Sequence, residues 1–128
     1  METRLEDLVR SAASQARRLA AAFPGTGRKD DFPWAVIGPF DAEVRGHLER
    51  DRRIEDERDR VLIASVTLAE TQGGDSEETI ERARRHLVRA VDYLEEAVLR
   101  FGIVNREAAR RGYGAAGDPV ATRSDRPV

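Results

Sequence analysis

The residues of this chain that could do chemistry are few. The 128 residues include no cysteine and only two histidines, His47 and His86, which excludes disulfides, thiolate zinc sites and a catalytic thiol. Glu43, His47 and Asp51 recur every four residues, so a single helix would carry these three carboxylate and imidazole ligands on one stripe. His86 cannot join them, because in the hairpin argued below it lies about 22 Å from His47 along the helix axis. We therefore expect no metal site.

An acidic cluster offers one further route to catalysis. Glu77, Glu78 and Glu81 form a Glu-Glu-x-x-Glu pattern that resembles the acidic motif of the all-α nucleotide pyrophosphohydrolases, a family in which acids on a second helix complete a magnesium site. The resemblance covers five residues, and here the next acids, Asp92 and Glu95, follow on the same expected helix. Acids in a first helical turn are also favoured by the helix dipole. With no serine in a nucleophile elbow, the sequence predicts a non-enzymatic protein without a cofactor.

Composition and charge narrow the class of protein further. Charged residues make up 36% of the chain, hydrophobic residues 40% and aromatic residues 5%, and the formal net charge is −2. A nearly neutral chain has no overall field that attracts nucleic acid or an anionic membrane. No apolar run reaches the length of about 18 residues that a membrane helix needs, and the first residues lack the pattern of a signal peptide. We expect a soluble, cytoplasmic protein that does not contact a membrane.

Heptad spacing predicts an antiparallel helical hairpin in the second half of the chain. One series of residues recurs every seven positions: Ile80, Leu87, Leu94 and Phe101. A matching series precedes the Gly73-Gly74 pair: His47, Ile54, Val61 and Leu68. Folding the chain at the two glycines sets the series opposite each other, from Leu68 against Ile80 to His47 against Phe101.

Capping residues and apolar periodicity define the remaining elements. Helices are expected over residues 3–23, 41–72 and 76–101, with a short helix over 105–111. The expected N-caps of the three long helices are Thr3, Asp41 and either Asp75 or Ser76. The connection 24–40 is expected to be extended, and the tail 112–128 to be flexible. The fold class is then an all-α, three- to four-helix bundle within one domain, residues 1–111, in which the N-terminal helix packs against the hairpin.

The length of the hairpin suggests a partner. A single helix over 41–72 would span about 48 Å, whereas a compact globule of this chain length is roughly 36 Å across. We therefore expect a second copy or another chain to complete the bundle. Residues 61–68 are rich in β-branched side chains, and a buried strand is the alternative for that run.

The expected function follows from the apolar part of the hairpin that a single chain would leave uncovered. The apolar half of the connection carries three aromatic residues, and the hairpin seam adds large aliphatic ones, as candidate interface anchors. These anchors are Phe32, Trp34, Phe40, Ile54, Leu87 and Leu94. The sequence thus predicts a small helical subunit for interaction, assembly or regulation, which binds itself or a larger protein.

A basic stripe supports an alternative hypothesis. Four arginines lie close together on the last long helix: Arg82, Arg84, Arg85 and Arg89. Together with the arginines of the tail, they would let the chain act as a helical subunit of a complex that handles nucleic acid.

Overall fold

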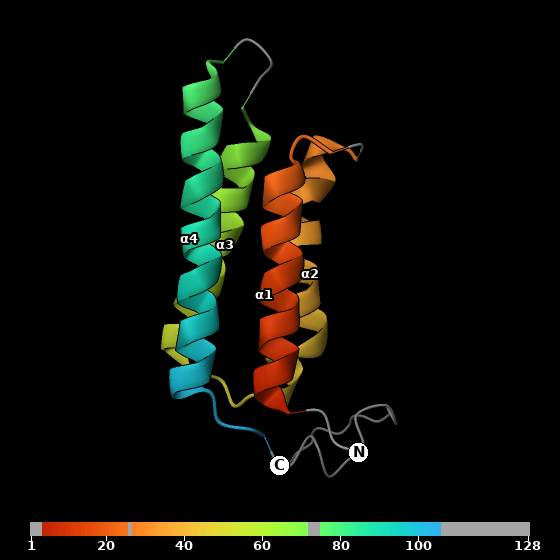
Figure 1. Cartoon of the computed structure of the whole chain (residues 1–128). Coiled ribbons are helices and arrows are strands. Elements are labelled where there is room, and N and C mark those ends of the chain that lie inside the picture. The colour runs from red at the N-terminus through yellow and green to blue at the C-terminus, as the bar shows by residue number, and fades with distance from the viewer. Residues whose placement is uncertain (1–3, 26, 72–74, 106–128) are drawn as a thin grey trace, which may run out of the picture.

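The computed structural model of the chain describes residues 4–25, 27–71 and 75–105. Within these ranges the fold is an all-α bundle of four helices: α1 (Leu5–Ala22), α2 (Phe32–Glu43), α3 (Arg52–Ala69) and α4 (Glu77–Phe101). Two short 3₁₀ turns, Lys29–Asp31 and Arg45–His47, flank α2. Figure 1 shows that successive helices run in opposite directions, up and down the bundle. The predicted all-α class is confirmed.

The four helices pack in a square. Helix α1 contacts α2 and α4, and α3 contacts the same two helices from the other side, with the most extensive contact between α3 and α4. The core between them is almost wholly aliphatic. On α1 it is built from small residues, Ala12, Ala13, Ala16 and Ala20, which let the neighbouring helices approach closely.

The predicted hairpin corresponds to α3 and α4 (Figure 1). The central members of both heptad series, Ile54, Val61 and Leu68 on α3 and Leu87 and Leu94 on α4, are buried in the core. Residues 61–68 are helical, so the strand alternative is wrong.

Both hairpin helices begin at a side-chain cap, although only one of these caps was expected. Of the two expected candidates, Asp75 and Ser76, it is Ser76 that caps α4, because its hydroxyl accepts a hydrogen bond from the Thr79 N–H. At α3 the cap is Asp51, whose carboxylate accepts from the Arg53 N–H. Asp41, the predicted cap, lies instead near the end of α2.

The single helix predicted over 41–72 is wrong. Helix α2 ends at Glu43, a 3₁₀ turn follows, and α3 does not begin until Arg52. Val44 and Leu48 at the break are both buried, and the backbone beside them pairs with the segment after α4: the Glu49 N–H donates to the Ile103 carbonyl and the Asn105 N–H donates to the His47 carbonyl. Helix α3 has 18 residues and spans about 27 Å. The hairpin therefore fits within the bundle, and the length argument for a covering partner does not hold.

The extended connection predicted over 24–40 is also wrong in its second half, which forms α2. Pro33 lies in the first turn, where the missing N–H of a proline leaves no intrahelical bond unmade. Pro39 lies inside the helix, and a proline normally disfavours helical geometry at the preceding residue through its Cβ. That residue is Gly38, which has no Cβ. Helix α2 buries Val36 and Ile37 and is the fourth helix of the bundle.

Arginine–carboxylate pairs tie the helices together at their exposed edges. Arg17 on α1 contacts Asp92 and Glu95 on α4. Arg58 on α3 lies 2.7 Å from Asp41 on α2. The guanidinium of Arg53 lies 3.7 Å from the centre of the Phe101 ring, which joins the start of α3 to the end of α4. This contact replaces the predicted pairing of His47 with Phe101, since His47 lies outside α3.

Other expected features lie beyond the described ranges. These are the capping role of Thr3, the Gly73-Gly74 turn, the helix over 105–111 apart from Asn105, and the tail 112–128. In the part of the chain that is described, no helix has the length and apolar character required to cross a membrane.

Gly102, the residue that ends α4, lies against neighbouring atoms. A Cβ added there would lie 2.5 Å from the carbonyl oxygen of Val98 and 3.2 Å from Leu48 Cδ2. We expect Gly102→Ala to lower the free energy of unfolding by about 1–3 kcal/mol, measured by urea denaturation. Gly25→Ala is the control, because its Cβ would meet nothing within 4 Å. Equal stability of the two variants would contradict this account.

The N-terminus of α3 makes the stability depend on acid pH. The Arg53 side chain, assisted by backbone N–H groups, lowers the pKa of Asp51 to about 2, and the hydrogen bond from Arg45 lowers the pKa of Glu55. Carboxylates with a lowered folded-state pKa stabilise the fold above their unfolded pKa of about 4, and this contribution is lost as pH falls toward the folded value. We expect the melting temperature to fall between about pH 5 and pH 2.

Asp51→Asn separates the charge of this cap from its hydrogen bond. The amide oxygen can still accept from the Arg53 N–H, but it does not titrate. The melting temperature of this variant, followed by circular dichroism, should depend less on pH below about pH 4 than that of the unaltered chain. An unchanged pH profile would rule out a role for the Asp51 charge.

Candidate functional site

The candidate metal and acidic motifs lie apart from one another in the described part of the chain. Among the described residues no three His, Cys, Asp or Glu side chains are placed to hold a metal ion. The predicted stripe of Glu43, His47 and Asp51 is divided between the end of α2, the 3₁₀ turn and the cap of α3. Glu78 and Glu81 pair with arginines of their own helix.

The basic stripe is divided by the structure. Arg82, Arg85 and Arg89 are exposed on α4, and two of them lie near acids one turn earlier, Arg82 by Glu78 and Arg85 by Glu81. Arg84 is half-buried and points toward α1 instead. The four arginines therefore do not form one surface, and acidic neighbours offset part of the charge that a phosphate backbone would meet.

Four of the six predicted interface residues belong to the core of this chain. Phe40, Ile54, Leu87 and Leu94 are buried among the four helices. Their prediction as interface anchors is wrong, because α1 and α2 already cover the hairpin seam that the sequence left open. Of the remaining two, Phe32 is half-buried at one end of the bundle and Trp34 is 61% exposed.

The exposed tryptophan lies beside exposed aliphatic residues of the neighbouring helix. A groove of about 410 Å³ between the start of α2 and the end of α3 is walled by Trp34, Leu62 and Val66, with charged residues at its edge. On α3, Ile63 is 65% exposed and Val66 39% exposed. We call the groove residues Trp34, Leu62 and Val66, together with Ile63, which is exposed three residues before Val66 on α3, the Trp34 face.

The outer side of α2 extends this apolar surface. From Phe32 to Phe40 the helix carries no charged side chain, and its solvent-facing positions are Trp34 and Ala35, with Gly38 and Pro39 half-exposed. A surface helix normally presents charged and polar residues on its outer side. The outer side of α2 therefore has the composition of a contact surface.

The residues that α3 contributes to the Trp34 face were not predicted, although the sequence contains a signal for them. The run 61–68 is apolar at almost every position, so as a helix it must place apolar residues outside as well as inside. The heptad series drew attention to Val61 and Leu68, which face inward. Ile63 and Val66 lie between them and face outward.

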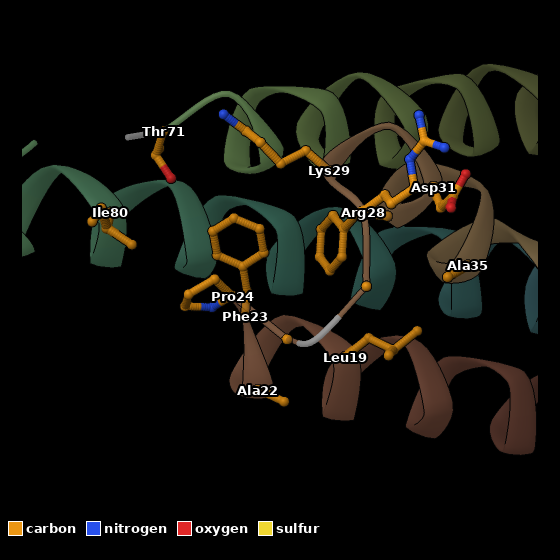
Figure 2. A pocket seen from close by; sticks show the side chains of 13 residues that line it. Leu19, Ala22, Phe23, Pro24, Arg28, Lys29, Asp31, Ala35, Thr71 and Ile80 are labelled. Carbon is orange, nitrogen blue, oxygen red and sulfur yellow. The ribbon is translucent and has the colours of Figure 1, made fainter. Parts of the chain in front are cut away.

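A second hollow, which we call the end pocket, lies where the α1–α2 connection crosses the end of the bundle. It has a volume of about 680 Å³, with walls from α1, α2, the end of α3 and the start of α4. Figure 2 shows Phe23 near its centre, with Leu19 and Ile80 on different sides, and Phe32 also lines it. The two rings pack with centroids 5.0 Å apart and planes at 59°. Arg28, Lys29 and Asp31 supply the charged groups.

Arg84 positions the aromatic wall of the end pocket. Its guanidinium donates hydrogen bonds to the carbonyl oxygens of Ala20, at 2.9 Å, and Phe23, at 2.7 Å. These carbonyls lie at the C-terminal end of α1, where helices leave acceptors unpaired and favour a cation. Arg84, which the nucleic-acid hypothesis placed in the basic stripe, therefore caps the C-terminal end of α1 from its position on α4 and holds the backbone of Phe23.

The fold and both surfaces can be compared with known proteins. No family model matches the chain, and searches of curated proteins and of solved structures return no significant match.

Removal of the Arg84 cap tests its structural role. Arg84→Met keeps an unbranched side chain but leaves two α1 carbonyls without this donor, so we expect the free energy of unfolding to fall by about 1.5–3 kcal/mol. The matched control is Arg82→Met on the exposed side of the same helix, expected within about 0.5 kcal/mol of the unaltered chain. Urea denaturation of the three proteins is the measurement. Similar values for both variants would contradict the capping role.

Proposed function

We propose that this chain is a non-enzymatic interaction module that pairs with a second copy of itself through the Trp34 face. The observation that carries the proposal is the exposure of Trp34, the only tryptophan of the chain, in a groove that it shares with Leu62 and Val66, next to an α2 surface without charge. Large aromatic side chains of this kind dominate the energy of protein interfaces when a partner buries them.

The charges around the groove favour a second copy as the occupant. Lys29 lies at one edge, and Asp30 and Glu70 also line the groove. A two-fold interface places the same surface on both sides, so each surface must complement itself. A groove that carries both signs of charge beside an apolar centre meets this condition, because Lys29 of one copy can face an acid of the other.

The packing of α2 is also compatible with close approach of a second helix. A Cβ at Gly38 would meet nothing within 4 Å, and Ala35 is the other small residue on this side. Full burial of a large apolar side chain contributes about 1.5–3 kcal/mol, and association costs about 4–15 kcal/mol in lost freedom of motion. The few large residues of the Trp34 face therefore favour a dimer that dissociates in the micromolar range.

The oligomeric state can be measured from the molecular mass in solution and from the fluorescence of Trp34. Between about 1 and 200 µM, light scattering should show a rise from the monomer mass toward twice that value. Over the same range the Trp34 emission should shift to shorter wavelength and acrylamide quenching should weaken, because pairing removes the indole from water. A constant monomer mass with unchanged emission would overturn the proposal.

Two matched variants locate the interface. Ile63→Glu puts a charge on the Trp34 face at a 65% exposed position, and Leu99→Glu makes the same change at a 41% exposed position on α4. Ile63→Glu should remain monomeric with unshifted Trp34 emission, whereas Leu99→Glu should pair as the unaltered chain does. Pairing that survives Ile63→Glu, or is lost in Leu99→Glu alone, would contradict the assignment. A complex that forms only with a different protein would also contradict it.

A further inference from the structure

The end pocket has the size and the walls of a small-molecule site, and it is separate from the apolar residues of the Trp34 face. Its volume of about 680 Å³ lies within the range of about 300–1,000 Å³ typical of ligand pockets. Four large apolar residues around it, Leu19, Phe23, Phe32 and Ile80, are only half-buried. Their exposed parts face one hollow rather than being scattered over the surface.

The wall is held in place by contacts that do not depend on a ligand. Phe23 and Phe32 pack against each other, and Arg84 fixes the carbonyl of Phe23 from α4. Both rings are also packed against the core cluster. A pocket whose aromatic wall is already ordered loses little freedom when an apolar group enters it, which favours binding.

The charged groups at the pocket favour a ligand with an acidic group. Arg28 and Lys29 both line it, together with one acid, Asp31. Figure 2 shows Lys29 on the side of the pocket away from Leu19. Two cations and one acid give the lining a net charge of +1, and Lys29, the only lysine of the chain, supplies its ammonium group. A flexible point charge of this kind can accept a carboxylate or a sulfonate.

We infer that the end pocket binds small anionic amphiphiles, molecules with an aromatic or aliphatic body and one acidic group. The body packs against Phe23 and Phe32, and the acidic group reaches Lys29. Binding requires one copy of the chain only, but Lys29 also lines the groove of the Trp34 face, so pairing and the acidic group would compete for this one charge and not for the aromatic wall.

Two fluorescent probes separate the apolar contribution from the charge. Anilinonaphthalene sulfonate carries an aromatic body and a sulfonate, and N-phenyl-1-naphthylamine has the same rings without the acid. We expect the sulfonate to saturate one site per folded chain. Lys29→Gln should weaken its binding about three- to fivefold, as expected for an exposed ion pair, and leave the neutral probe unchanged. Arg60→Gln, on the exposed side of α3, is the charge control and should change neither.

A second pair of variants tests the location. Ala22→Leu extends a side chain at an exposed residue that lines the pocket, and Ala21→Leu makes the same change at an exposed neighbour outside the lining. Ala22→Leu should lower the affinity of both probes at least about threefold, and Ala21→Leu should lower the affinity of neither. Equal effects of the two variants, or the absence of a saturable site, would overturn the inference. An equal effect of Lys29→Gln on both probes would overturn the role of the charge.

The same measurements distinguish this site from the proposed dimer. Ile63→Glu leaves the end pocket untouched, so it should bind both probes as the unaltered chain does, even though pairing is lost. Loss of probe binding in this variant would place the probes on the Trp34 face and contradict the inference. A monomeric chain that binds the probes would contradict the proposed dimer alone.

Discussion

The burial of α2 between α1 and α3 is the constraint on which the rest of this structure depends. Val36, Ile37 and Phe40 fill the side of the hairpin that α1 leaves open, and without them two of the four sides of the square would lose their packing. Val44 and Leu48 add to the same core after α2 ends, and the backbone of 47–49 pairs with 103–105 before α3 begins at Arg52. The closed core, the short hairpin and the position of Trp34 all follow from this one packing.

Closure of the core decides what remains for other molecules. The anchors of the heptad seam are used inside the chain, so recognition is left to residues that the fold leaves on the outside. These residues form two surfaces of different shape: the Trp34 face, which is broad and apolar with mixed charges, and the end pocket, which is concave with an aromatic wall. The first suits another protein surface, and the second suits a small molecule.

Arginine side chains contribute mainly to the structure. Arg17, Arg58 and Arg84 each connect two helices, through carboxylates in the first two cases and through the carbonyls at the end of α1 in the third. The planar guanidinium can donate several hydrogen bonds at once, which suits it to such contacts between helices better than the ammonium of lysine. An abundance of arginine is therefore weak evidence for a nucleic-acid partner in a small helical protein.

The sequence by itself determined the helical class, the pairing of the last two helices as a hairpin and the inward side of most positions in both heptad series, because these depend on local spacing and on residues close in the chain. Only the tertiary structure decided that 32–43 is a helix, that the chain breaks after Glu43, and that Trp34 is exposed while Phe40 is buried. Pro39 is tolerated in α2 because Gly38 precedes it and the helix buries one apolar side against α1 and α3. The stabilisation from this burial comes from contacts with residues that are distant in sequence, so no local sequence pattern predicts it.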